Sequence, residues 1–227
     1  MSGLNLQRIT DLDIACQTMA FDFLGKILAR RLDDGTVLRG RIVETECYPG
    51  GEDKASHSHN GRRTPSNEPM YMAAGTSYVY MTYGMYHCFN ISSKEPGAAV
   101  LLRALEPVEG LDVMQRLRKD RKKKLDDRQL KVDELCNGPS KLCISLNITK
   151  IECNKLDLTQ SDTLWLEHDP EFSARNIQVV KTSRIGIASA GEEWSKKPLR
   201  FYILGNPSVS KRDKNLETKL NSVDFSD

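Results

Sequence analysis

The sequence predicts an α+β fold in a single domain with a mainly antiparallel β-sheet. A length of 227 residues suits one domain, and no repeat or linker rich in proline, glycine or serine divides the chain. Predicted strands occur in clusters with helices between the clusters, which favours α+β over a doubly wound parallel sheet. We expect one domain over residues 1–210. Residues 211–227 are polar and mixed in charge, and we expect a largely disordered tail there.

The first predicted element is a helix near the amino terminus, where Thr10 and Asp13 have the spacing of a capping box. The apolar residues that continue it at helical spacing are Phe21, Leu24, Ile27 and Leu28. Asp34 and Gly35 then mark a tight turn. The element order therefore starts with a helix followed by a turn.

Six later segments carry the β-branched or apolar signature of strands. They are residues 37–46, 77–82, 88–92, 99–105, 163–166 and 199–204. Helices are expected at about residues 108–117 and after Pro139, because proline suits the first turn of a helix.

Composition predicts a globular protein rather than a membrane span or a disordered chain. Apolar residues make up 39%, charged residues 28%, and the mean hydropathy is −0.49. The first twenty residues alternate polar and apolar instead of forming a secretory signal, so we expect an intracellular protein without a membrane anchor. The six cysteines lack C-x-x-C spacing, and we expect buried free thiols. Seven of the nine residues from Arg116 to Lys124 are basic, which is typical of a solvated loop or of a nonspecific DNA contact.

Tyrosines are concentrated in one part of the chain, with five of the seven between residues 71 and 86. Tyr78 and Tyr80 lie two apart in a predicted strand and share one face. Tyr83 and Gly84 follow, and the glycine permits a hairpin tip from which the tyrosine projects. A packed sheet face is the simpler interpretation of this feature alone, and stacking of a nucleobase is the alternative.

Two carboxylates, Glu44 and Glu46, are expected on one side of the strand over residues 37–46. Such a pair is costly to bury without cations or hydrogen-bond donors. A glutamate held as a carboxylate beside an arginine can deprotonate water, the general-base role in cleaving a glycosidic bond with inversion. The alternative is a pair of ion-paired glutamates on a solvent-facing sheet.

Histidines and basic residues supply weaker signals. His57 and His59 form an H-x-H pair that Cys47 or Cys88 could extend to a metal site, but no second spaced pair completes it, so we expect no metal. A neutral pocket histidine fits better, and a solvated loop histidine is the alternative. The turn into a helix at residues 137–142 suits a phosphate.

Five long stretches spread over the chain from about Phe21 to Ser210 carry a family resemblance. They are RGRIVETECYPGGEDKASHS, GTSYVYMTYGMYHCFNISS, AVLLRALEPVEGL, ELCNGPSKL and KPLRFYILGNP. Together they resemble the alkyladenine (methylpurine, 3-methyladenine) DNA glycosylases of the vertebrate type. The resemblance implies a single α+β domain with a curved antiparallel sheet, flanking helices and a protruding β-hairpin that intercalates in DNA. It also implies a monomer without cofactor or metal.

The resemblance assigns roles to individual residues. It implies that Glu46 is the general base, that Arg103 helps it to hold the attacking water, and that Ile185 supplies a main-chain carbonyl to that water. The substrate-binding residues that it implies are Tyr48 and Tyr80, which sandwich the base, His57, which binds the base edge, and Asn90, which contacts certain purines. The DNA-binding residues are Tyr83, which intercalates, and Met85, Tyr86, Arg62, Thr64 and Lys141.

These assignments predict a monofunctional glycosylase of base excision repair. It would flip alkylated adenine or guanine, ethenoadenine or hypoxanthine out of double-stranded DNA and hydrolyse the N-glycosidic bond, without lyase activity. The alternative is a noncatalytic nucleic-acid-binding module that stacks bases on tyrosines, and a metal-dependent hydrolase built on His57 and His59 is a third reading. The resemblance places the protein in a nucleus, and a bacterial cytoplasm is the alternative location.

Overall fold

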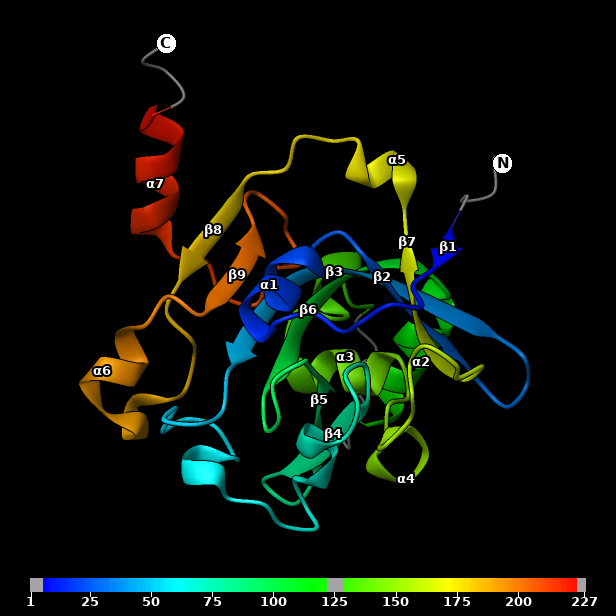
Figure 1. The fold of residues 1–227 in the computed structure, drawn as a ribbon. Coiled ribbons are helices and arrows are strands. Elements are labelled where there is room, and N and C mark those ends of the chain that lie inside the picture. The colour runs from blue at the N-terminus through cyan, green and yellow to red at the C-terminus, as the bar shows by residue number, and fades with distance from the viewer. Residues whose placement is uncertain (1–5, 122–128, 224–227) are drawn as a thin grey trace.

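A computed structural model describes residues 6–121 and 129–223 and shows a single β-sheet in which all strand pairs are antiparallel (Figure 1). The strand order is β1-β7-β2-β3-β6-β5-β4, with β9 paired to β3 and β8 to β9. The strands are β1 (Gln7–Arg8), β2 (Ile27–Arg31), β3 (Val37–Tyr48), β4 (Ser77–Thr82), β5 (Tyr86–Ser92), β6 (Ala99–Glu109), β7 (Leu164–His168), β8 (Val179–Thr182) and β9 (Arg200–Ile203). This arrangement confirms the predicted α+β class.

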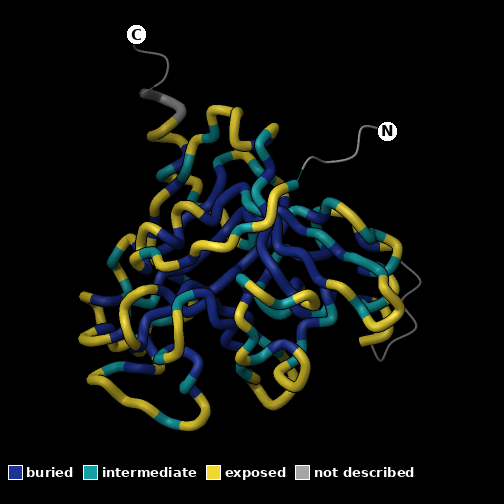
Figure 2. The backbone as a smooth tube through the Cα atoms, turned by 45° about the vertical axis from the view of Figure 1, so that its right-hand side comes forward, coloured by how far each residue is buried: buried dark blue, intermediate teal, exposed yellow. Residues whose placement is uncertain are grey.

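Short helices cover the sheet and connect its strands. They are α1 (Cys16–Asp22), α2 (Leu111–Asp120), α3 (Pro139–Ser145), α4 (Lys150–Cys153), α5 (Pro170–Ser173), α6 (Gly191–Lys196) and α7 (Lys214–Val223). Single 3₁₀ turns lie at His59–Gly61, Glu68–Tyr71, Val132–Glu134 and Ala188–Ala190. Helix α1 packs on β3 and β6, and α3 packs on β5, β6 and α2. Buried backbone runs through the middle of the sheet, and exposed backbone is concentrated in the connections (Figure 2).

The amino-terminal helix is shorter than predicted. It starts at Cys16 instead of near Thr10 and ends at Asp22, so Ile27 and Leu28 lie in strand β2. Gly25 adopts a φ of +87°, which lets the chain turn out of the helix. Pairing of β2 with both β3 and β7 then buries these two apolar residues completely, so tertiary pairing overrides their helical spacing.

The predicted strands are all present, and several elements were not predicted. Strand β6 extends to Glu109, so the next helix begins at Leu111 rather than near residue 108. Strands β1 and β8 and helix α6 are short and carry too few residues for a periodic signal. The turn at Asp34 and Gly35 joins β2 to β3 as expected, with Gly35 at a φ of +84°.

The carboxyl-terminal segment differs from the predicted disordered tail. Helix α7 docks through Glu217, which accepts a hydrogen bond of 2.9 Å from the hydroxyl of Tyr202 in β9. The same hydroxyl accepts from the backbone N–H of Asp213, and the Asp213 carboxylate accepts from Thr182 in β8. These buried polar contacts attach to the sheet a segment that has few apolar residues. Residues 224–227 lie outside the described residues, as do Lys122, Lys123 and Lys124 of the basic run.

All six cysteines are buried and free, as predicted. Cys47 in β3 faces Cys16 in α1, with 3.0 Å between the two sulfur atoms. In the described part of the chain, no helix combines the length and the apolar character needed to cross a membrane.

Candidate active site

Strand β3 divides its side chains between two environments. The Thr45 hydroxyl donates to the carbonyl of Ala20 in α1, and Cys47 contacts the same helix, so these residues face α1. Because side chains alternate along a strand, Glu44, Glu46 and Tyr48 point to the opposite side. The predicted carboxylate pair therefore lies on the face of β3 that α1 leaves open.

Glu46 is fully buried and receives donors from three directions. The Tyr48 hydroxyl donates to its Oε2 at 2.8 Å, and the backbone N–H of Ile185 donates to Oε1 at 2.7 Å. An Nη of Arg103, which projects from β6, lies 3.3 Å from Oε1. Donors and a cation of this kind stabilise the ionised carboxylate. The structure thus brings Glu46, Arg103 and Ile185 together, with the amide of Ile185 directed at the carboxylate.

Glu44 forms a second buried charge cluster beside Glu46. Its Oε1 lies 3.3 Å from the Arg103 Nε and 2.7 Å from an Nη of Arg200, and its Oε2 accepts from the backbone N–H of Ser210 at 2.7 Å. Burial excludes the alternative of a solvent-facing ion pair. Because Arg103 bridges the two carboxylates, Glu44 orients the arginine that reaches Glu46.

Beside Glu46, a small cavity collects the predicted base-binding residues. It is lined by Tyr48, His57, Met70, Tyr78, Tyr80, Asn90 and Ala99. The rings of His57 and Tyr80 are 4.7 Å apart in an edge-to-face arrangement, and those of Tyr78 and Tyr80 are 5.5 Å apart. Cross-strand pairing of β4 with β5 places Asn90 directly opposite Tyr78 and Cys88 opposite Tyr80. The four predicted base-binding residues therefore share one cavity.

Tyr78 belongs to this cavity although only its neighbour Tyr80 was assigned to base binding. Its hydroxyl lies 2.8 Å from Nδ1 of His57, and its carbonyl accepts from the Asn90 amide at 3.1 Å. The alternation of Tyr78 and Tyr80 along one strand was the available signal for this role.

Desolvation keeps the polar side chains of the cavity neutral. His57 lies at the exposed mouth, yet the surrounding protein desolvates its ring, and this effect together with the positive charge of Arg62 lowers the histidine pKa. Burial raises the pKa of the Tyr48 phenol far above its usual value, and the adjacent Glu46 carboxylate raises it further. Near neutral pH the cavity thus presents an uncharged histidine and uncharged phenols.

The cavity continues into an open groove with which it shares His57, Tyr78 and Tyr80. Arg62 and Thr64 line this groove, as do Lys54 and Lys150. Strand β4 and the turn at Tyr83 also line the groove, and the β4–β5 hairpin protrudes from the sheet (Figure 1). At the hairpin tip Tyr83 is 88% exposed and has a left-handed φ of 52°.

Exposed apolar side chains gather at this tip. They are Met81, Tyr83, Met85 and Tyr86. An exposed apolar cluster on a protruding element is typical of a surface that contacts a partner. The predicted DNA-binding residues of the hairpin are thus displayed together.

Lys141 is separate from the groove and the cavity. It lies exposed on α3, where its Nζ donates to the Asn137 side chain at 2.7 Å, and it lines neither space. The turn before α3 is formed by Gly138 and Pro139 as expected.

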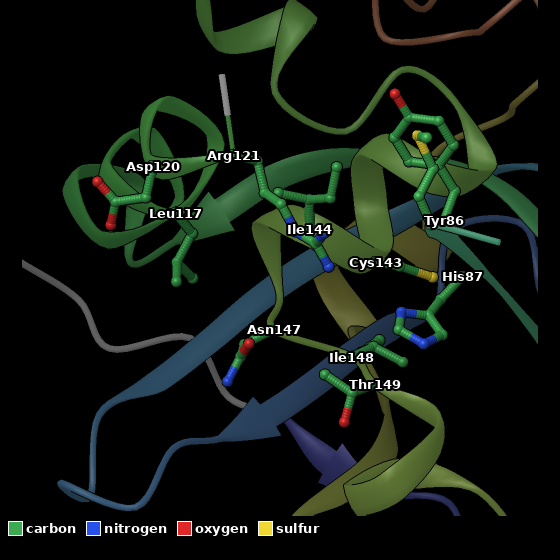
Figure 3. A pocket seen from close by; sticks show the side chains of 11 residues that line it. Tyr86, His87, Leu117, Asp120, Arg121, Cys143, Ile144, Asn147, Ile148 and Thr149 are labelled. Atoms are coloured by element: carbon green, nitrogen blue, oxygen red, sulfur yellow. The ribbon is translucent and has the colours of Figure 1, made fainter. Parts of the chain in front are cut away.

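A further cavity lies on the other side of the hairpin (Figure 3). Cys143, Ile144 and Ile148 supply apolar lining, and His87 of β5 also lines this cavity. Because His87 and Cys88 are neighbours in a strand, they point to opposite faces, and Cys88 shares the face of Tyr80. Met85 and Tyr86 border this second cavity, but the residues predicted to act in catalysis do not line it.

The histidine pair does not form part of a metal cluster in the described ranges. Nδ1 of His57 is engaged with Tyr78, and no group of three or more histidine, cysteine or acidic side chains that could hold an ion occurs among residues 6–121 and 129–223.

Comparison with known proteins extends these observations. A family model described as methylpurine-DNA glycosylase matches residues 10–207. The chain is 56% identical over 197 residues to the DNA-3-methyladenine glycosylase of Mus musculus, and 54% over 196 residues to that of Homo sapiens. These matches cover 87% and 86% of this chain but 59% and 65% of the relatives, so the chain spans about three-fifths of the length of these mammalian proteins. A probable DNA-3-methyladenine glycosylase of Encephalitozoon cuniculi is 49% identical over 200 residues, which are 88% of this chain and 90% of that protein.

Proposed function

Because the chain belongs to the methylpurine-DNA glycosylase family, we propose that it excises damaged purines from double-stranded DNA by hydrolysis of the N-glycosidic bond. The substrates in this proposal are alkylated adenine and guanine, ethenoadenine and hypoxanthine. The protein acts as a monomer in base excision repair and resides in the nucleus.

One observation carries the proposal: the fully buried carboxylate of Glu46 lies beside a cavity walled by tyrosines. A module that merely stacks bases needs aromatic rings and cations but no carboxylate that activates water. Two hydrogen-bond donors and the Arg103 guanidinium surround the Glu46 carboxylate, and such surroundings suit a general base.

In the proposed reaction, Glu46 takes a proton from a water molecule as its oxygen attacks the anomeric carbon. The glycosidic bond breaks, and its electron pair leaves with the base. Arg103 and the carbonyl of Ile185 help to hold the water in this scheme. In this scheme water attacks the anomeric carbon directly, no covalent amine intermediate forms, and the DNA strand is not cleaved.

Base recognition in this proposal combines stacking with hydrogen bonding. Tyr48 and Tyr80 enclose the base, and cation–π attraction favours purines that carry the positive charge of N-alkylation. With the Tyr78 hydroxyl donating to Nδ1 of His57, the Nε2–H of the histidine is free to donate to the base edge. Asn90, fixed by its bond to the Tyr78 carbonyl, opposes the exocyclic amino group of guanine.

The hairpin tip supplies the wedge that flipping requires. A base reaches such a cavity only after it leaves the DNA stack, and an aromatic side chain can fill the gap. Tyr83 keeps a left-handed φ, which is uncommon for a bulky residue and costs about 1–3 kcal/mol. Backbone strain that holds an exposed ring at the tip supports a functional role for this ring.

The decisive experiment compares base release and DNA binding in wild type and Glu46→Gln on duplexes that carry one damaged purine. Glutamine keeps the size of the side chain but cannot accept the proton. We expect a loss of about 10²-fold or more in single-turnover base release, with affinity for damaged DNA largely retained. Glu109→Gln, at the exposed end of β6, is the matched control and should behave as wild type.

Undiminished release by Glu46→Gln would refute the general-base assignment. Binding without release by the wild-type protein would favour the noncatalytic stacking module. Borohydride trapping of a protein–DNA adduct would contradict direct hydrolysis, and loss of activity with a chelator would favour a metal-dependent reaction.

A further inference from the structure

Behind the cavity lies an ion pair that the proposed reaction does not use. Two Nη atoms of Arg184 donate to the two carboxylate oxygens of Asp53 at 2.6 and 2.8 Å. Both side chains are completely buried. Because removing two charges from water is expensive, a fully buried pair needs close geometry and further hydrogen bonds to persist.

The pair connects three segments of the active site. An Nη of Arg184 also donates to the carbonyl of Cys47 at 3.1 Å, between the two β3 residues of the site, Glu46 and Tyr48. The residue after Arg184 is Ile185, whose amide binds Glu46. Asp53 lies in the loop that leads to His57. The pair therefore links Tyr48, Glu46 and the loop that leads to His57.

Arg184 supports the Tyr48 ring from behind. Its guanidinium carbon lies 4.6 Å from the ring centroid. The arginine side chain has no exposed surface and does not line the base cavity, whereas Tyr48 does. The cation therefore stacks on the side of Tyr48 that faces the protein interior, and the base would stack on the other side.

This arrangement has an electrostatic consequence for the bound base. A lone guanidinium behind Tyr48 would repel a positively charged purine in front of the ring, since the charges would be within about 10 Å of each other in a region of low dielectric. The Asp53 carboxylate cancels most of that field. A paired arginine thus stiffens the ring without adding net charge.

We propose that Asp53 and Arg184 are positioning residues that determine lesion preference: Arg184 fixes the Tyr48 wall, and Asp53 keeps that wall tolerant of cationic bases. This inference rests on the proposed glycosylase function and deepens it. It concerns the ratio of two excision rates: that of purines that are positively charged by alkylation and that of neutral damaged purines.

The test measures single-turnover excision of 7-methylguanine and of hypoxanthine in wild type and Asp53→Asn at pH 6, where 7-methylguanine keeps its N1 proton and is cationic and hypoxanthine is neutral. Asparagine retains the shape of the side chain, and arginine keeps its charge at this pH, so the variant places an uncompensated cation behind Tyr48. We expect the excision ratio of 7-methylguanine to hypoxanthine to fall about tenfold. A purely structural role would slow both lesions by the same factor, and that result would overturn the proposal.

The double variant Asp53→Asn/Arg184→Gln is the matched control. It removes both charges and keeps an amide pair, so the ratio should return to within about twofold of wild type. Arg184→Gln alone gives an independent arm if Asp53→Asn does not fold. It removes the cation behind Tyr48, so we expect the ratio to stay at or above the wild-type value, and a lowered ratio would overturn the proposal.

Failure of this inference is distinguishable from failure of the proposed function. If the wild-type protein excises neither lesion, the glycosylase function is wrong. If it excises both lesions and Asp53→Asn leaves the ratio of 7-methylguanine to hypoxanthine excision unchanged, the glycosylase function is supported. The proposed role of Asp53 and Arg184 in lesion preference is then wrong.

Discussion

The hydroxyl and the ring of Tyr48 have different roles. Its hydroxyl donates to the Glu46 carboxylate, and its ring separates the base cavity from Arg184. A buried carboxylate that loses a donor loses about 1–3 kcal/mol of stabilisation. The two tasks can therefore be separated by a substitution that removes one oxygen atom and keeps the ring.

Tyr48→Phe should slow base release more than it weakens binding. The ring remains available for stacking, while Glu46 loses the hydrogen bond to Oε2 and is oriented by Ile185 and Arg103 alone. We expect single-turnover rates to fall about tenfold with a change in affinity of less than about threefold. Equal losses in both quantities would mean that the hydroxyl contributes to binding instead.

His57 should titrate below the usual histidine range. Desolvation and Arg62 lower its pKa in the folded protein, so below about pH 6.5 the unfolded chain binds the proton more readily. Wild type should therefore lose more stability than His57→Gln as the pH falls through that value. Denaturant unfolding of both proteins between pH 5 and 8 measures this difference, and NMR titration locates the histidine pKa directly.

The β4–β5 hairpin presents a different set of residues on each of its two sides. Alternation gives its strands one face toward the base cavity and another toward the cavity of Figure 3. Its turn holds Tyr83 and Gly84 with positive φ angles, a combination typical of tight hairpin turns. The tight turn places the tip at the end of the two strands, away from the middle of the sheet.

Tyr83→Ala should weaken capture of the flipped state by about 1–3 kcal/mol, the usual contribution of stacking between a base and an aromatic side chain. The loss should be greatest for lesions that remain well paired, because these are the hardest to extrude. Binding to duplexes with paired and with mismatched lesions measures this dependence. Ile151→Ala, an exposed apolar residue on α4, serves as the control. Equal effects on both duplexes would indicate a simple surface contact.

Helix α7 is an element that depends on a few polar contacts. Burial raises the pKa of the Tyr202 phenol to about 12, so the hydroxyl remains a donor to Glu217 throughout the neutral range. Tyr202→Phe should lower the free energy of unfolding by about 1–2 kcal/mol, because Glu217 and the Asp213 amide each lose a partner. Thermal melting checks the stability, and faster proteolysis after Ser210 would show undocking of the helix. An unchanged melting temperature would contradict this account.

At the scale of the whole molecule, one continuous core joins the sheet to α1 and α3 and contains most of the cysteines. Burial raises the pKa of the Cys136 thiol to about 12, and that of Cys143 is raised well above its usual value. Buried thiols with raised pKa react slowly because the thiolate is the reactive species.

The native protein should therefore show little reaction with a thiol reagent such as Ellman's reagent, whereas the unfolded chain should react at all six cysteines. The rate of labelling in increasing denaturant should follow global unfolding. Rapid labelling of one thiol under native conditions would show that this part of the core opens locally.

Local patterns predicted a large part of this fold. The strand segments of β3, β4, β5, β6, β7 and β9 carry enough β-branched and apolar residues to be recognised, and Pro139 marked the start of α3. Helical spacing gave a wrong prediction of helix at Ile27 and Leu28, because strand pairing on both sides of β2 decides their conformation. Helix α7 was missed because its docking depends on hydrogen bonds to β8 and β9, which a polar sequence does not reveal.

The sequence by itself determined which side chains of a strand share a face, so Glu44 could be grouped with Glu46, and Tyr78 with Tyr80, from their spacing. Tertiary structure alone decided which distant residues contact these side chains. Arg103 and Ile185 reach Glu46 from 57 and 139 residues away, and Asp53 meets Arg184 across 131 residues. The physical reason is that periodicity records the orientation of a side chain within its own strand. Desolvation and charge pairing arise only when distant strands and loops pack together.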